Sequence, residues 1–159
     1  MFQIGDKIVH PLHGAGVIED IVERTIDGES TRYYALKLAL DDTQLFLPVD
    51  ACEKLGIRPV CSKKQAEDFL ARLDDVARGE DKGWNQRYRE NMLHIRSGDL
   101  LEVAQVVKNL AERESERGLS TGEKKMLSSA RQILDSEIAF ALGKTPQEAQ
   151  ALINERLCI

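Results

Sequence analysis

The sequence predicts an α+β protein, with a small β-barrel over residues 1–60 followed by an all-helical bundle over residues 61–159. Two observations indicate this fold class. Short apolar runs separated by turn residues fill the first part of the chain, whereas apolar residues recur at helical spacing in the second part. The pattern changes near residues 60–62, where we place the domain boundary. A chain of 159 residues is long enough for two small domains.

The strands of the first domain are predicted from short runs rich in β-branched, aromatic and aliphatic residues. These runs cover residues 7–10, 16–22, 33–38 and 44–48. Turn residues separate them at 11–14, Asp27-Gly28 and Asp41-Asp42, and Asp-Gly is a strong hairpin signal. We expect a helical turn over 49–55 and a last short strand near 57–58. So few short strands favour a small, strongly bent barrel of the SH3 or Tudor kind.

Most of the predicted helices of the second domain have a capping residue in front of them, and most end at a glycine or a polar break. The expected starts are Ser62, Trp84, Asp99, Ser120 and Thr145, and the expected ends are residues 78–83, Gly98, Gly118 and Gly143. A glutamine or glutamate follows Ser62, Ser120 and Thr145 at capping-box spacing. The second domain is therefore expected to be a compact bundle of about four or five helices.

Charge and cysteine content narrow the class of protein. A net charge of −5 argues against a DNA-binding protein that acts alone, because neutralising phosphates requires a surplus of Lys and Arg. Residues 82–98 differ, with four basic residues against one acidic residue. Three cysteines without CxxC spacing predict no disulfide framework and suit the reducing cytoplasm. The short apolar runs and the N-terminal sequence indicate neither a membrane span nor a secretion signal.

The motifs of enzymes and metal sites are incomplete. Gly143-Lys144-Thr145 resembles the end of a phosphate-binding loop, but Ile138 stands where that motif needs its first glycine. His10 and His13 have only His94 as a further histidine, whereas zinc requires three or four ligands. We therefore predict no enzymatic activity, no cofactor and no metal. An enzyme whose site assembles from scattered carboxylates is an alternative.

Trp84 is the residue with the most distinctive surroundings. It is the single tryptophan, it stands at the expected start of a helix, and Arg87 and Arg89 follow it closely. One interpretation is core packing, because Trp84 continues an apolar stripe with Tyr88 and Ile95. The other is a wedge that inserts between bases in the minor groove while arginines hold phosphates. The first turn of a helix is an exposed place for so large a side chain, which favours the wedge.

Several short motifs occur along the whole chain in an order that resembles a known protein family. They are Gly5-Asp6-Lys7, His10-Pro11, Gly14-Ala15-Gly16, Pro48, Leu55-Gly56-Ile57-Arg58, Trp84 with Arg87-Tyr88-Arg89, Ser97-Gly98-Asp99, Arg117-Gly118-Leu119-Ser120 and Gly122-Glu123-Lys124-Lys125-Met126-Leu127. In this combination the chain resembles the CarD/CdnL family of bacterial transcription regulators. The N-terminal half is also similar to the polymerase-binding module of the transcription–repair coupling factor.

The resemblance implies two partners. A Tudor-like N-terminal domain would dock on the β subunit of RNA polymerase, and the helical domain would meet promoter DNA at the upstream edge of the transcription bubble. The implied polymerase-facing residues are Arg24, Thr25, Ile26 and Phe46. The expected DNA-facing residues are Trp84, as a wedge in the minor groove, with Arg87, Arg89, Lys124 and Lys125. Phe46 departs from the family, which is basic there in some members, so this interface is either more apolar or excludes that position.

These expectations define a mechanism and its main rival. An acidic protein with a small basic region should bind free DNA weakly and with little sequence preference. Attachment to polymerase raises its effective concentration into the millimolar range, so a weak contact with melted DNA suffices to stabilise the open complex. We expect a monomeric cytoplasmic protein without membrane contacts. The rival is an interaction adaptor, whose sheet accepts a strand from a protein partner and whose bundle never touches DNA.

Overall fold

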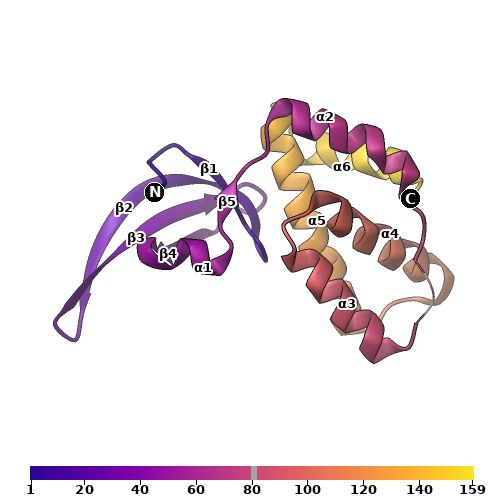
Figure 1. The fold of residues 1–159 in the computed structure, drawn as a ribbon, viewed down its shortest axis with the longest axis horizontal. Coiled ribbons are helices and arrows are strands. Elements are labelled where there is room, and N and C mark those ends of the chain that lie inside the picture. The colour runs from indigo at the N-terminus through magenta and orange to yellow at the C-terminus, as the bar shows by residue number, and fades with distance from the viewer. Residues whose placement is uncertain (80–81) are drawn as a thin grey trace.

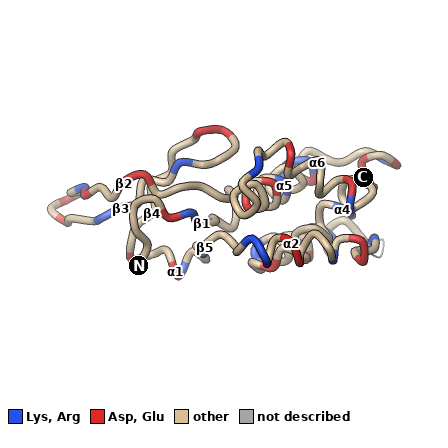
Figure 2. Tube along the Cα trace, turned by 90° about the horizontal axis from the view of Figure 1, so that it is seen from above, with Lys and Arg blue, Asp and Glu red and all other residues tan. Residues whose placement is uncertain are grey.

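The structure is a computed structural model that describes residues 1–79 and 82–159. An antiparallel sheet from the first part of the chain lies beside a group of helices from the second part (Figure 1), which confirms the predicted α+β class. Charged residues of both signs are spread over both parts (Figure 2). The polar break predicted over residues 78–83 includes Glu80 and Asp81, which lie outside the described residues.

Five antiparallel strands form an open sheet. They are β1 (Lys7–His10), β2 (Gly14–Ile26), β3 (Glu29–Leu38), β4 (Gln44–Pro48) and β5 (Arg58–Pro59). Their order is β4-β3-β2-β1-β5, so β4 and β5 are the two edges of the described sheet. The predicted closed barrel is not confirmed, because these edges do not pair. β5 has only two residues, which pair with β1, and the five residues of β4 pair with β3.

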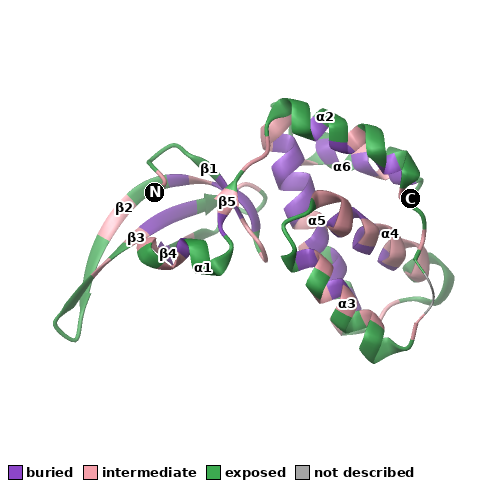
Figure 3. Ribbon diagram, viewed as in Figure 1, coloured by how far each residue is buried: buried purple, intermediate pink, exposed green. Residues whose placement is uncertain are grey.

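The β2–β3 hairpin is longer than the sequence predicts. Its pairing continues outward to Ile26 and Glu29. The outer half is exposed (Figure 3), and polar residues therefore occupy both faces there and hide the alternation that marks a half-buried strand. Asp27 and Gly28 form the turn with φ values of 52° and 80°. Positive φ at both central residues is what a type I′ hairpin turn requires, so the Asp-Gly signal is confirmed.

The helices begin and end close to the predicted positions. They are α1 (Cys52–Leu55), α2 (Lys63–Arg72), α3 (Trp84–Arg96), α4 (Leu100–Arg117), α5 (Thr121–Leu142) and α6 (Pro146–Leu157). A turn of 3₁₀ helix over Val49–Ala51 precedes α1, and another over Leu73–Asp75 follows α2. The helical turn predicted for residues 49–55 is thus confirmed, and the described helices after it form the predicted bundle.

Side-chain caps explain why the helices start where they do. Ser62 and Thr145 form complete capping boxes at the starts of α2 and α6. Ser120 caps α5 by accepting a hydrogen bond from the backbone N–H of Glu123. The Glu123 carboxylate does not complete this third box, because it pairs with Arg87. A side chain that local sequence assigns to a cap therefore serves tertiary packing.

The longest helix, α5, is buried along much of its length (Figure 3) and forms the centre of the helical core. Val9 and Ala15 of the sheet are buried in this same core. A smaller separate core belongs to the sheet and α1, and its members are Ile8, Ile18, Tyr34, Leu36, Leu38, Leu47, Cys52 and Ile57. The sheet and the bundle therefore pack against each other through α5 rather than being joined only by the chain.

Candidate nucleic-acid interface

α3 carries an aromatic pair at its N-terminal end. Trp84 is the first residue of α3 and Tyr88 follows it by four residues, which places both on one side of the helix. Their rings stack with centroids 5.4 Å apart and planes inclined by 22°. Trp84 remains 48% exposed and Tyr88 is also exposed. The tyrosine thus supports the indole while much of the indole stays in contact with solvent.

The N-terminus of α5 lies against this aromatic pair. A Cβ placed on Gly122 would lie 3.9 Å from ring carbon Cε2 of Tyr88. Lys124 and Lys125 follow in α5 and are both exposed. The first turn of a helix carries a partial positive charge, which adds to the two lysines in attracting phosphate. The structure therefore brings Trp84, Lys124 and Lys125 to neighbouring helix ends.

Arg87 connects the starts of α3 and α5. Its Nε and one terminal nitrogen donate to the two carboxylate oxygens of Glu123 at 3.1 and 3.2 Å, and the other terminal nitrogen donates to the backbone oxygen of Lys82 at 2.8 Å. The Arg87 side chain is only 14% exposed and Glu123 is buried. A DNA contact by Arg87 stays a prediction, and it would require the guanidinium to share its bond with Glu123.

Arg89 lies on a different face of α3. It is exposed, and because it follows Trp84 by five residues it is rotated by about 140° around the helix axis. DNA that contacts both residues would have to pass around the outside of α3. The structure does not place Arg89 beside the aromatic pair, so its contact with DNA also stays a prediction.

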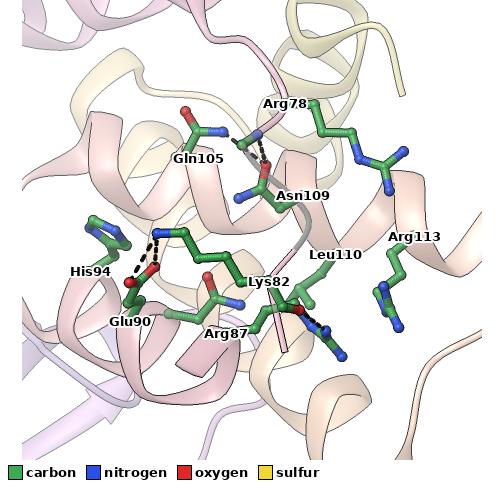
Figure 4. A pocket seen from close by; sticks show the side chains of 11 residues that line it. Arg78, Lys82, Arg87, Glu90, His94, Gln105, Asn109, Leu110 and Arg113 are labelled. Atoms are coloured by element: carbon green, nitrogen blue, oxygen red, sulfur yellow. Dashed lines mark hydrogen bonds and ion pairs between the residues drawn. The ribbon is translucent and has the colours of Figure 1, made fainter. Parts of the chain in front are cut away.

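α3 and α4 enclose a polar pocket of about 250 Å³ (Figure 4). Lys82 donates hydrogen bonds to both carboxylate oxygens of Glu90 at 3.0 and 2.9 Å. The side-chain oxygen of Asn109 accepts from the backbone N–H of Gly79 at 2.8 Å and from Gln105 at 2.9 Å. These bonds attach Gly79 to α4 and Lys82 to α3, the helix that carries the aromatic pair.

The predicted polymerase-facing residues gather on the outer part of the sheet. Arg24, Thr25 and Ile26 are consecutive and exposed at the end of β2. Phe46 is exposed in β4, and the guanidinium carbon of Arg24 lies 4.5 Å from the centroid of its ring. This geometry is a cation–π contact. Phe46 therefore belongs to the same surface as Arg24. A contact of this surface with polymerase stays a prediction.

Sequence reasoning misses the contacts of two residues near Trp84. Tyr88 enters it only through the core-packing interpretation, although its spacing of four residues from Trp84 is a signal for stacking on one helix face. Glu123 is assigned to a cap. The ion pair between Glu123 and Arg87 joins residues 36 positions apart, and local sequence carries no signal for such a contact.

The histidine pair is a feature of a turn. The rings of His10 and His13 lie 4.6 Å apart, and Nδ1 of His10 accepts a hydrogen bond from the backbone of Leu12. Burial, with a smaller contribution from His13, lowers the pKa of His10 to about 4. In the described ranges, no three His, Cys, Asp or Glu side chains gather in a way that could hold a metal ion. No described helix is long and apolar enough to span a bilayer.

Comparison with known proteins places both parts of the chain in one family. The model of the CarD C-terminal domain matches residues 68–154, and the model of the CarD-like/TRCF RID domain matches residues 2–61. The chain is also 33% identical over 151 residues to the putative transcription factor YdeB of Bacillus subtilis (strain 168), which covers 95% of this chain and 99% of that protein. With both halves matched and a relative aligned almost end to end, the chain belongs to the CarD family.

Proposed function

We propose that this protein regulates transcription by binding the β subunit of RNA polymerase and stabilising the open promoter complex. Its partner DNA is the upstream edge of the bubble, where Trp84 enters the distorted minor groove as a wedge. Family membership and the similarity to a putative transcription factor support a role in transcription. The wedge itself is supported by the side chains at the start of α3.

The exposed indole of Trp84 is the observation that carries the proposal. A side chain of this size is 48% exposed, although Tyr88 stacks on it. Stacking an aromatic ring on an unpaired base contributes about 1–3 kcal/mol. Because only melted DNA offers such a base, this energy favours the open over the closed complex by roughly five- to a hundredfold. Lys124 and Lys125 are exposed in the first turn of α5, whose Gly122 lies against Tyr88, and we expect them to hold a neighbouring phosphate.

Attachment to polymerase is assigned to the surface formed by Arg24, Thr25, Ile26 and Phe46. The exposed isoleucine and the arginine–phenylalanine contact provide apolar area with one positive charge. This attachment overcomes the weak DNA affinity of a chain with a net charge of −5.

The open-complex lifetime with a Trp84→Ala variant tests the proposal. The variant should bind polymerase as well as wild type and shorten the lifetime of open complexes by about five- to a hundredfold. Leu93→Ala is the matched control, because Leu93 is 66% exposed on α3 but lies about 180° from Trp84 around the helix. It should leave the lifetime unchanged.

An unchanged lifetime with Trp84→Ala at several promoters would exclude the wedge. If polymerase binding were intact in that case, the protein would be an interaction adaptor whose helical bundle does not act on DNA. The adaptor alternative is thus decided by the same comparison.

A further inference from the structure

Glu137 of α5 is a fully buried carboxylate, with an exposed fraction of 0%. Among the described residues, its hydrogen-bond donors come from the sheet and from the chain that leaves it. The two terminal nitrogens of Arg58 in β5 donate to its two oxygens at 2.7 and 2.6 Å, and the backbone N–H of Cys61 donates to one of them at 2.9 Å. Three hydrogen bonds across the boundary between the sheet and the bundle therefore end on one side chain.

Neighbouring contacts at the same boundary allow little freedom. The hydroxyl of Ser136 accepts a hydrogen bond from the backbone of Ala15 in β2 at 2.8 Å. A Cβ on Gly14 would lie 2.7 Å from both the backbone oxygen of Gln132 and the hydroxyl of Ser136, so β2 approaches α5 as closely as a glycine permits. Lys7 also lies above the ring of Phe140 in α5, at 5.4 Å.

A buried carboxylate makes this boundary specific. An ionised group away from water is strongly unfavourable unless it is paired and hydrogen-bonded. The two parallel hydrogen bonds from the Arg58 guanidinium to the Glu137 carboxylate can form in only one relative orientation of these planar groups. If the sheet and the bundle turned relative to each other, Glu137 would lose these donors while remaining buried.

We propose that Glu137 is a positioning residue that locks the sheet and the helical bundle into one rigid body and so sets the reach from the β2–β3 hairpin to Trp84. The hairpin tip and α3 lie at opposite ends of the molecule (Figure 1). The lock is inferred from the contacts of Glu137 with Arg58 and Cys61 and does not depend on the proposed function. Its effect on reach rests on the proposed function, because it assumes that polymerase holds one end and DNA contacts the other.

The labelling rate of Cys61 with iodoacetamide reports on the lock. Burial and the neighbouring Glu137 raise the pKa of the Cys61 thiol to about 12, whereas Arg58 acts in the opposite direction. Removing Arg58 alone would therefore make the thiol less reactive, unless the boundary opens. In full-length Arg58→Ala we expect at least tenfold faster alkylation of Cys61, measured by peptide mass spectrometry.

Three further measurements separate opening of the boundary from unfolding of the protein. Cys52 is buried in the separate core of the sheet, and its alkylation rate should stay at the wild-type value. Arg58→Lys keeps the charge but loses the fork, and should give a Cys61 rate between those of wild type and Arg58→Ala. Lys64→Ala removes an exposed positive charge from α2 and should leave the Cys61 rate unchanged. If Arg58→Ala also speeds the alkylation of Cys52, that variant has unfolded the sheet. The Cys61 rate of Arg58→Lys, compared with wild type, then tests the lock.

Wild-type labelling of Cys61 in both Arg58 variants would overturn the lock. The open-complex lifetime tests its consequence separately: Arg58→Ala should shorten the lifetime at least fivefold while binding polymerase normally. Faster labelling with an unchanged lifetime would retain the lock and overturn its role in setting the reach. A normal lifetime with Trp84→Ala would instead reject the wedge, whatever the labelling shows.

Discussion

At the scale of single residues, the placement of Trp84 depends on the side chains that contact it and its helix. Tyr88 stacks on the indole, and Arg87 ties the first turn of α3 to Glu123 at the start of α5. Arg87 has few hydrogen-bonding groups left for DNA, because the same guanidinium also bonds the Lys82 backbone. Its main contribution is therefore expected to be to the stability and placement of α3.

Replacing Arg87 with alanine should lower the free energy of unfolding by about 3–5 kcal/mol, because it leaves the Glu123 carboxylate buried without its partner. Arg89→Ala removes the same charge from an exposed position of the same helix and should change stability by less than about 0.5 kcal/mol. Urea unfolding of the two variants measures the difference. Equal midpoints would contradict a structural role for Arg87.

Asp135 makes stability depend on pH. Burial raises the pKa of its carboxyl to about 6 from an ordinary value of 3.8, and Arg131 offsets only part of this effect. Because the folded state binds this proton more tightly than the unfolded state, the stability it contributes is present below about pH 4 and is lost as pH rises towards 6.

Asp135→Asn should therefore stabilise the protein at pH 7 by roughly 1–3 kcal/mol and flatten the stability profile between pH 4 and 6. Thermal unfolding at several pH values measures both effects. Asp68→Asn, at an exposed position on α2, is the control and should follow the wild-type profile. A variant at Asp135 that was no more stable than wild type at pH 7 would show that the buried carboxylate carries no such cost.

At the scale of elements, sequence predicted those features that depend on neighbours along the chain. Ser62 and Thr145 mark helix starts because capping acts over three residues, and Asp27-Gly28 marks a turn because its backbone conformation is local. The openness of the sheet could not be predicted, since it depends on whether two distant edges meet. The contact between Arg24 and Phe46 was likewise hidden, because another strand lies between theirs.

The surface formed by Arg24, Thr25, Ile26 and Phe46 gives a prediction at the scale of elements. Arg24→Glu should weaken binding to RNA polymerase at least fivefold, because it reverses a charge on the proposed surface and removes the cation–π contact that orients Phe46 there. Lys54→Glu reverses an exposed charge on α1 and should bind as wild type does. Fluorescence anisotropy with labelled protein measures both affinities. Equal affinity of Arg24→Glu and wild type would place the interface elsewhere.

At the scale of the whole molecule, we expect this acidic chain to reach DNA by being held near it. The sheet and the bundle share buried residues and the Arg58–Glu137 bond, so a molecule held at the hairpin would carry α3 with it at a set distance. Sequence could not predict the docking of the two parts, because Glu137 and Arg58 are 79 positions apart. The aromatic pair and the two lysines of α5 would then meet DNA together.

Photo-crosslinking tests the contact between Trp84 and DNA most directly. Iodouracil placed at the upstream edge of the bubble crosslinks to an aromatic ring stacked against it, and mass spectrometry identifies the attached peptide. In open complexes the crosslink should map to Trp84, and it should be absent from closed complexes and from Trp84→Ala. A crosslink that maps outside α3, or an equal yield with Trp84→Ala, would contradict the wedge.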